Sequence, residues 1–471
     1  MKKSRMTHAG SRLLAALFMV VIGASLIGMN GTIVRAAESM QEPSQVQAQE
    51  QSQDQEPPQA EVQNQEQMQA LPPSPSQEQE KPLTAAFVRG GALWMKIGSE
   101  EKQLTQAEHV LSPKWSNDGQ WLAYAAGEQS NELWMLDVST GAKHLVAANG
   151  GRNYKWSPNR LLLAFDEEQR LYVVDSQEAT KPVEVSSAIG AISNYGWLPE
   201  GDGFVVSTQG TFNGQTPVRI MQLAMQPDMT GAGSVQAKQL YVMPSQLNEL
   251  PVVGTSVFKW SANGKWMAFL AIPTASLSAD SNTLCVLAAD GSVFKPVDQM
   301  VNHAGWIQWS PQRDELAYIG GIGREATSNK QLRVTSVPDI QPRNDLTPAG
   351  FVDQDFTWRS PVNIVVSRAK ASDGTDSSGN RPYPNLVSVK LDGGQQKRIT
   401  KNADGYGDFG PVSLGAAGLG WVRSNRSMAN VLVAPPGQGE NKAVQWIANI
   451  DIGTNYYEQW NWNSVLKFSG K

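Results

Sequence analysis

Six segments of the chain repeat one pattern, and this repetition limits the possible folds more than any other feature. Each copy has a short apolar run ending in tryptophan, then a polar turn, then a second apolar-rich run; KWSNDGQWLAYAA from Lys114 and FKWSANGKWMAFL from Phe258 are two examples. The aligned tryptophans are Trp115, Trp156, Trp197, Trp260, Trp309 and Trp358, spaced by 41, 41, 63, 49 and 49 residues. Repeats of this length indicate a fold assembled from similar units that pack against one another.

The internal order of each copy predicts four short antiparallel strands. A third strand-like run follows the first two, as in ELWMLDV from Glu132, and it leads into a turn and a fourth short segment. Asn-Gly and Asp-Gly pairs suit tight hairpin turns, and proline favours the first turn position. Such four-stranded units, repeated around a ring, are the blades of a β-propeller, so the sequence predicts an all-β propeller over residues 83–471. One tryptophan per copy at a constant place is what packing between blades requires, so we interpret these residues as core and not as a carbohydrate-stacking surface.

Two incomplete units at the ends of this region predict how the ring closes. The segment AAFVRGGALWMKIGSEEKQLT from Ala85 has three strands of a blade but no tryptophan-bearing first strand. The aromatic run YYEQWNWNSVLKF from Tyr456 has the pattern of one strand, but no further strands follow it to complete a blade. We predict that this run completes the N-terminal blade, which leaves no exposed sheet edge. Part of the aromatic cluster could instead form a ligand platform: Tyr456, Tyr457, Trp460 and Trp462.

The number of blades depends on how one degraded copy is read. Counting the composite blade gives seven, which is the number we predict. The segment PVSLGAAGLGWVRS from Pro411 follows the repeat but lacks its tryptophan. If this segment forms a full blade, the propeller has eight, and this is the alternative.

The unit W-S-P-x-G-x-x-[LI]-A-[FY], followed by a D/E-L-[WY]-V-x-D strand, resembles the TolB-like propeller repeat of the PD40 type. The same repeat occurs in the propeller domains of prolyl oligopeptidases. The resemblance runs from about Ala85 to the C-terminus, with departures at Trp197, which Leu-Pro follows, and Trp358, which Arg-Ser follows. It implies a propeller in an exported bacterial protein and another envelope protein as partner. It implies little about activity, because one fold serves both scaffolds and enzymes.

The N-terminal 82 residues predict export and a spacer. Residues 1–36 contain four basic residues before an apolar run from Leu13 to Gly28, and then the sequence VRAA, as a cleaved signal peptide does; an uncleaved membrane anchor is the alternative. Residues 37–82 are rich in Gln, Glu and Pro, and we expect a disordered linker there. The single cysteine, Cys285, excludes a disulfide within the chain and favours a bacterial source for an exported protein.

Composition argues against several classes of function. The formal net charge is −5 and the acidic excess lies mainly in the linker, so no basic face for nucleic acid is expected. The sequence has no G-x-S-x-G motif, and the histidines of the predicted propeller, His109, His144 and His303, are scattered, so we assign no catalytic, metal or cofactor site. A pair of carboxylates at the channel mouth would make a glycosidase or lyase, and this enzyme class is kept as an alternative.

The connections between the second and third strands differ most among the copies. They lengthen in four successive copies, and equivalent connections of a propeller emerge on one face, where long loops commonly carry recognition. We therefore predict a partner-binding face that includes Thr211, Asn213, Ser276, Arg324, Asn329, Asp373, Asp376 and Arg381. The expected protein is a non-enzymatic, monomeric scaffold outside the cytoplasm that binds another envelope protein. The alternative partner is a cell-wall or other polysaccharide, and membrane contact would occur only through an uncleaved N-terminal segment.

Overall fold

The computed structural model describes residues 82–225, 236–372, 381–438 and 440–470. The predicted signal segment, residues 1–36, and the predicted linker up to residue 81 lie outside the described residues, as do Asp373 and Asp376. Within the described ranges, no helix is both long and apolar enough to cross a membrane.

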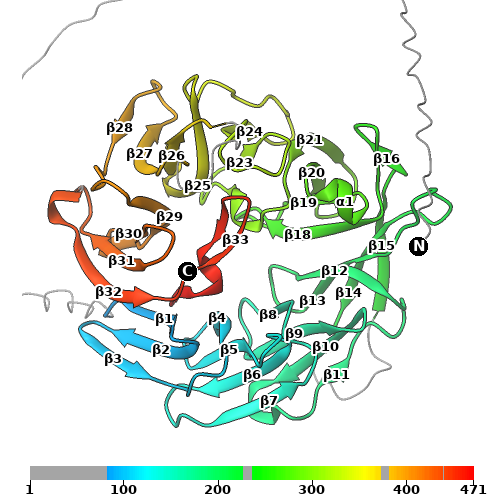
Figure 1. Cartoon of the computed structure of the whole chain (residues 1–471). Helices are drawn as coiled ribbons and strands as arrows, with labels where there is room; N and C mark the ends of the chain where they lie inside the picture. Colours follow the sequence, from blue (N-terminus) through cyan, green and yellow to red (C-terminus); the bar gives the residue numbers. More distant parts are fainter. Residues whose placement is uncertain (1–81, 226–235, 373–380, 439, 471) are drawn as a thin grey trace, which may run out of the picture. The chain divides into compact units, whose positions relative to one another are not determined.

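Eight antiparallel sheets stand around a central axis as the blades of a propeller, numbered here in chain order (Figure 1). Blade 1 contains β1 (Thr84–Arg89), β2 (Ala92–Ile97), β3 (Glu100–Gln103) and the last strand, β35 (Leu466–Phe468). Blade 2 contains β4 (Leu111–Trp115), β5 (Trp121–Ala126), β6 (Glu132–Asp137) and β7 (Lys143–Ala147). Blade 3 contains β8 (Tyr154–Trp156), β9 (Leu162–Glu167), β10 (Arg170–Asp175) and β11 (Val183–Glu184). Blade 4 contains β12 (Ile192–Trp197), β13 (Gly203–Thr208), β14 (Arg219–Ala224) and β15 (Gln236–Val242).

The second half of the ring follows the same order. Blade 5 contains β18 (Gly254–Trp260), β19 (Trp266–Ile272), β20 (Asn282–Ala288) and β21 (Phe294–Met300). Blade 6 has three strands, β22 (Ile307–Trp309), β23 (Glu315–Gly320) and β24 (Gln331–Ser336), in the described part of the chain. Blade 7 contains β25 (Phe351–Ser360), β26 (Asn363–Lys370), β27 (Asn385–Lys390) and β28 (Gln396–Arg398). Blade 8 contains β29 (Gly407–Ser413), β30 (Leu419–Ser424), β31 (Ala429–Ala434) and β32 (Val444–Ile450).

The described residues also contain two small hairpins and six short helices; both hairpins, η2 and η5 lie between blades, and the other four helices connect strands within a blade. The hairpins pair β16 (Gln246–Leu247) with β17 (Leu250–Pro251), and β33 (Thr454–Tyr456) with β34 (Gln459–Asn461). The helices are α1 (Ala275–Ser278) and the 3₁₀ turns η1 (Ser176–Glu178), η2 (Ala304–Trp306), η3 (Gly415–Ala417), η4 (Glu440–Lys442) and η5 (Trp462–Ser464).

The prediction of an all-β propeller is confirmed, but the count of seven blades is wrong and the alternative of eight is right. The degraded copy from Pro411 lies within blade 8, a full four-stranded sheet. In blades 2 to 7 the repeated tryptophan pairs with the second residue of the next strand; in blade 8, Val412 occupies that place opposite Gly420. A blade can therefore form without the tryptophan, because strand alternation and turns suffice to build the sheet.

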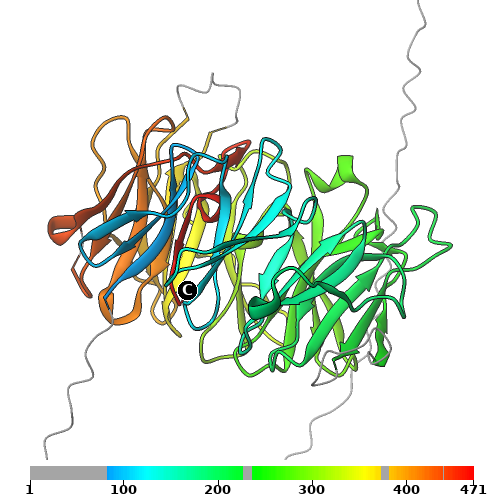
Figure 2. The same ribbon diagram turned by 90° about the horizontal axis from the view of Figure 1, so that it is seen from below.

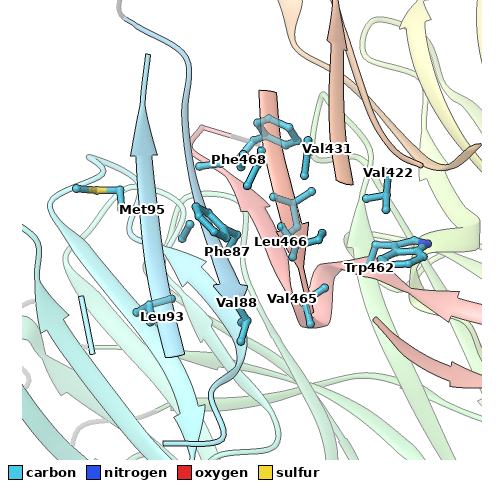
Figure 3. Close-up of a cluster of buried hydrophobic side chains, with 14 of the residues drawn as sticks. Phe87, Val88, Leu93, Met95, Val422, Val431, Trp462, Val465, Leu466 and Phe468 are labelled. Atoms are coloured by element: carbon cyan, nitrogen blue, oxygen red, sulfur yellow. The ribbon is translucent and has the colours of Figure 1, made fainter. Parts of the chain in front are cut away.

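The ring closes as predicted, through the C-terminal strand. β35 pairs with β1 in the register Ala85↔Phe468 and Phe87↔Leu466. Figure 3 shows Leu466 and Phe468 between Phe87 of blade 1 and Val431 of blade 8, so that their side chains join the first and last blades. The aromatic residues before β35 are not part of this strand, and their predicted assignment to the closing strand is wrong. They form the hairpin β33–β34 and η5, because the chain turns back before it enters blade 1.

Serine and glycine of the repeat shape the turn between the first and second strands. In blade 2, the Ser116 hydroxyl accepts a hydrogen bond from the backbone N–H of Trp121 at 3.0 Å, and Ser261 does the same in blade 5. Gly119 and Gly264 have φ values of +77° and +69°, a backbone conformation that residues other than glycine rarely adopt. The polar turn therefore serves the fold and presents no site.

The repeated tryptophans link each of blades 2 to 7 to the blade before it. Trp156 of blade 3 donates its indole N–H to the backbone carbonyl of Lys114 in blade 2 at 3.0 Å. The indole N–H also donates to the backbone carbonyl of the residue before the preceding tryptophan in three other blades: Trp197 to Lys155, Trp309 to Lys259 and Trp358 to Gln308. Trp115 of blade 2 donates in the same way to the carbonyl of Lys467 in blade 1. Trp260 differs slightly, because it donates to the carbonyl of the preceding tryptophan, Trp197. This regular chain of bonds places the tryptophans between blades, in agreement with their interpretation as packing residues.

Candidate binding face and central channel

The predicted recognition loops emerge on one side of the ring, which we call the loop face. It comprises the connections between the second and third strands of each blade and the connections between successive blades, because the four strands alternate in direction. The long connections, residues 209–218, 273–281, 321–330 and 371–384, belong to blades 4, 5, 6 and 7. Consecutive blades therefore carry all four of them.

The structure divides the predicted binding residues into two groups. Thr211 and Asn213 of blade 4, Ser276 of α1 and Asn329 of blade 6 are exposed. Arg324 and Arg381 are only partly exposed, since both make ion pairs within the loop face.

The two arginines brace neighbouring loops and are not free recognition groups. Arg324 of blade 6 donates to the carboxylate of Asp280 in the blade 5 connection, and this bond holds the pKa of Asp280 below its usual range. Arg381 of blade 7 lies 3.0 Å from Glu325 of blade 6. The bond of each arginine thus joins two adjacent blades, which limits relative motion of the loops.

The hairpin β33–β34 adds a further brace from the end of the chain. It arises in the connection between blades 8 and 1, and Figure 1 shows it (red) extending into the middle of the ring toward the opposite blades. The backbone N–H of Ala326 donates to the carbonyl of Tyr457 at 3.0 Å, and the side-chain amide of Gln459 donates to the carbonyl of Arg324 at 2.6 Å. The hairpin therefore contacts blade 6. In Figure 2, where the ring is seen from its edge, the red C-terminal segment reaches the upper side.

A buried carboxylate anchors this hairpin. Glu458, which is 3% exposed, accepts a hydrogen bond from Arg426 of blade 8 at 3.1 Å and lies 3.6 Å from Arg381 of blade 7. The Trp460 indole also donates to Glu458 at 3.1 Å. We did not predict this cluster from the sequence, because its members lie in three separate segments and share no motif.

Several large apolar side chains are exposed on the loop face. Among the described residues these are Phe212 (67% exposed), Met428 (50%), Ile322 (49%), Tyr456 (47%), Tyr457 (42%) and Leu277 (41%). They come from the connections of blades 4, 5, 6 and 8 and from the hairpin. Single apolar residues are normal on a surface, and these six share one face of the ring.

The residue before the repeated tryptophan reaches forward to the next blade and lines the channel. Lys114 donates its ammonium group to the carbonyl of Tyr154 at 2.6 Å, and Lys259 donates to the carbonyl of Ile307 at 2.7 Å. Lys155 makes the same bond to Tyr195, and Gln308 makes it to Phe356. Blade 4 has Gly196 at this position, where an added Cβ would meet the Cβ of Phe258 at 3.0 Å. These bonds run opposite to those of the tryptophans, so four neighbouring pairs of blades are joined in both directions: blades 2 and 3, 3 and 4, 5 and 6, and 6 and 7.

Burial changes the ionisation of the channel lysines. It lowers the pKa of Lys155 to about 7 and of Lys114 and Lys259 to about 8. The ammonium group of Lys467 lowers the pKa of Lys114 and Lys259 further, and burial also lowers the pKa of Lys467. Four cationic side chains therefore share one poorly hydrated channel.

Two cavities occupy the channel region. One, of about 410 Å³, is lined by Lys259, His303, Asp355, Trp462 and Lys467, among others. The other, of about 670 Å³, shares His303 with the first and reaches Tyr456 and Gln459 of the hairpin. Asp355 is the one carboxylate in the described lining of the two cavities. Burial raises its pKa to about 7, although the N–H of Phe356 and the charge of Lys259 both act to lower it.

The described chain is an eight-bladed β-propeller with a braced loop face and a cationic channel. Its repeat is TolB-like: a stretch of 48 residues is 46% identical to the Tol-Pal system protein TolB of Xanthomonas oryzae pv. oryzae (strain PXO99A). This match covers 10% of the chain and 11% of that relative, so it spans about a tenth of the relative's length. No family model matches the chain.

The chain is also similar to solved structures. The dihydro-heme d1 dehydrogenase NirN, in a complex with DHE, has a TM-score of 0.52 and 12% identity, and the similarity covers 82% of this chain and 78% of that one. A puromycin hydrolase mutant complexed with PGG has a TM-score of 0.44 and 13% identity, and the similarity covers 80% of this chain and 55% of that one. At such identities the likeness concerns the propeller architecture alone.

Proposed function

We propose that the protein is an exported bacterial scaffold that binds another envelope protein through its loop face and catalyses no reaction. The observation that carries this proposal is the set of exposed apolar side chains on the loop face, among them Phe212, Ile322 and Tyr457. Aromatic side chains are enriched at protein interfaces and are prominent among the few residues that carry most of the binding energy. The TolB-like repeat supports a place in the envelope, since the relative in Xanthomonas is a protein of the Tol-Pal system.

The bracing of the loops supports recognition of a macromolecule. The ion pairs of Arg324 with Asp280 and of Arg381 with Glu325 hold the loops of three blades in one arrangement. Loops that are already ordered lose little conformational entropy when they bind a partner. Arg324 and Arg381 would therefore act by positioning neighbours such as Ile322, while Thr211, Asn213, Ser276 and Asn329 would face the partner. Asp373 and Asp376, outside the described residues, remain part of the proposed face.

The channel favours a scaffold over a polysaccharide hydrolase. Glycoside hydrolysis uses two carboxylates that flank the bond to be cleaved, about 5 to 9.5 Å apart. Asp355 is the one carboxylate in the described lining of the two large cavities, and Glu458 lines a small neighbouring cavity together with it. Glu458 lies near Trp460, but it is buried and already paired with Arg426 and Arg381.

Site-specific photo-crosslinking in the intact bacterium tests the proposal. A photoreactive residue at position 212 or 322 should capture a defined envelope protein. The same residue at position 145 or 444 is the control, because Leu145 and Val444 are 42% and 59% exposed on outer strands away from the loop face. A product common to all four positions, or a peptidoglycan fragment in place of a protein, would contradict the proposed partner class.

The affinity of the captured protein gives the quantitative test. Phe212→Ser combined with Ile322→Ser should weaken binding by about 2 kcal/mol or more, because truncated interface anchors cost that much. Leu145→Ser combined with Val444→Ser removes the same kind of surface and should leave Kd unchanged. Equal Kd values for the two double variants would show that the loop face is not the interface.

A further inference from the structure

The 410 Å³ cavity in the channel collects positive charge that the protein does not neutralise. Lys259 and Lys467 both line it, and Lys114 is close enough to Lys467 for the two charges to repel each other. Lys259 is bonded to the carbonyls of Ala304 and Ile307, which are neutral acceptors. The ammonium group of Lys467 makes no hydrogen bond or ion pair with any described residue.

The facing acid does not balance these charges. Asp355 forms no ion pair within 4.0 Å in the described chain, and its carboxylate accepts a hydrogen bond from the N–H of Phe356 at 2.9 Å. With a pKa of about 7 it is partly protonated at neutral pH. The cavity therefore keeps a net positive charge when its lysines are protonated.

Two buried hydrogen-bonding groups of the cavity lining also lack partners. The indole N–H of Trp462, a side chain 5% exposed, has no acceptor among the described residues. Neither ring nitrogen of His303 has a hydrogen-bond partner of ordinary geometry there, and the backbone of Trp460 is at most a weak one. Buried polar groups are seldom left unpaired, because an unsatisfied one costs about 1 to 3 kcal/mol.

These observations point to one kind of ligand. We propose that the cavity binds a small oxyanion, a carboxylate or a phosphate group, held by Lys467 and Lys259 and by the N–H groups of Trp462 and His303. An oxyanion offers several acceptors and negative charge, which together satisfy all four groups. The neutral imidazole of His303 donates from one nitrogen, so it contributes a hydrogen bond and no charge.

The neighbouring cavity provides the approach to this site. It has about 670 Å³ and lies beneath the hairpin, lined by Lys114, Arg152 and Tyr456 and, like the inner cavity, by His303. Its cations extend the positive potential from the site toward the loop face, where a small anion would enter. The inner site shares none of the apolar side chains that we propose for protein binding; the outer cavity shares Tyr456 with them.

Calorimetric titration of the purified protein with inorganic phosphate and, separately, with citrate tests the proposal and distinguishes the two sources of the oxyanion. We expect binding of at least one anion at one site per chain. Lys467→Gln should weaken it about tenfold or more, as the loss of a charge-assisted hydrogen bond does. Absence of binding for both anions, or wild-type affinity in Lys467→Gln, would overturn the proposal.

A matched control separates the site from the general charge of the channel. Lys155→Gln removes an equally buried lysine that does not line the cavity, and Gln308 shows that glutamine can make the same bond to the next blade. The affinity of this variant should stay within about threefold of wild type, because Lys155 does not line the cavity and the charges that act on it are those of Lys114 and Asp166, not those of Lys259 and Lys467. An equal loss of anion affinity in both variants would mean that only the general positive charge of the channel attracts the anion, and this would contradict the proposal. If Lys467→Gln does not fold, Trp462→Phe takes its place, since it removes the indole N–H and keeps an aromatic ring.

Discussion

At the scale of single residues, the pair formed by the repeated tryptophan and the residue before it carries the contact between blades. The tryptophan donates backward, as Trp156 does to Lys114, and the preceding side chain donates forward, as Lys114 does to Tyr154. The repetition of tryptophan indicated packing. The forward bond could not be read from the sequence, because a lysine at a fixed place in a repeat is equally compatible with an exposed side chain.

Trp156→Ala and Trp260→Ala should each lower the free energy of unfolding by about 3–5 kcal/mol, as the removal of large packed aromatics does. Each change also leaves a backbone carbonyl of the preceding blade without its donor. Urea denaturation and thermal melting measure the loss. Phe212→Ala removes an exposed aromatic and serves as the control, with an expected change within about 0.5 kcal/mol. An unchanged melting temperature in both tryptophan variants would refute their packing role.

The lowered pKa values of the channel lysines predict how stability depends on pH. Between pH 7 and 8.5 the folded chain binds fewer protons at Lys155 than the unfolded chain does, so this residue's contribution to stability rises with pH. Asp355 acts oppositely at lower pH: its pKa is raised to about 7, so its contribution is lost as pH rises from about 4 to 7.

The difference between wild type and Lys155→Gln isolates the lysine. Urea denaturation from pH 6 to 8.5 should show that the variant is more stable than wild type near pH 6, where Lys155 of the wild type is protonated and buried. This advantage should shrink as pH rises and the lysine loses its proton. Parallel stability curves for the two proteins would show that Lys155 does not titrate in this range.

At the scale of elements, the hairpin β33–β34 shows how an aromatic run can be assigned to the wrong place. YYEQWNW has the composition of a strand, and the need for a closing strand made that assignment reasonable. In the structure, the three residues of β35 close the ring, and the aromatic run lies at the channel beside blades 6, 7 and 8. Local composition could not distinguish these places, because the decision depends on Arg381 and Arg426, which lie far earlier in the chain.

Glu458→Gln should release this hairpin. The change removes the charge that Arg381 and Arg426 share while leaving both arginines largely buried. We expect a loss of about 3 kcal/mol, as when one partner of a buried ion pair is removed, and faster amide exchange in residues 454–461. Hydrogen–deuterium exchange with mass spectrometry measures this. Glu184→Gln breaks an exposed pair with Arg170 and should cost less than about 1 kcal/mol; equal effects would contradict the anchoring role of Glu458.

Removal of β35 tests ring closure. A chain that ends after Asn463 loses Leu466 and Phe468 and exposes an edge of β1, so we expect aggregation and loss of a single cooperative melting transition. Size-exclusion chromatography and scanning calorimetry detect these changes. A chain shortened by residues 470 and 471 alone keeps β35 and should behave as wild type. A monomeric, cooperatively melting protein without β35 would mean that the strand is dispensable.

At the scale of the whole molecule, four-stranded blades and closure by the two chain ends were predictable, but the number of blades was not. Strand alternation, turn residues and the periodic tryptophan are local features that recur in each unit. Blade 8 has these features without its tryptophan, and the missing residue concealed a complete sheet from Gly407 to Ile450. The repeat was recognised by its tryptophan, whereas blade 8 forms from its strands and turns without that residue.

The placement of the four long connections on one face was predictable from the sequence, whereas the choice of partner-binding residues on them stays a prediction. Four lengthened connections at equivalent places must share a face, since propeller blades repeat their strand directions. Which side chains stay available for a partner depends on contacts between loops. Arg324 and Arg381 are engaged in ion pairs, while Phe212 and Ile322, absent from the prediction, are exposed.

The all-β architecture, the order of strands within a blade and the closure of the ring could be predicted from the amino-acid sequence, because they follow from periodicities and turn chemistry that act within about fifty residues. The eighth blade, the place of the hairpin, the pairing of Glu458 and the mutual proximity of the buried lysines Lys114, Lys155, Lys259 and Lys467 became visible only in the folded chain. The ring is the cause of this difference. It brings equivalent positions of distant blades to a common axis, where burial and mutual repulsion alter charges that are unremarkable in each repeat alone.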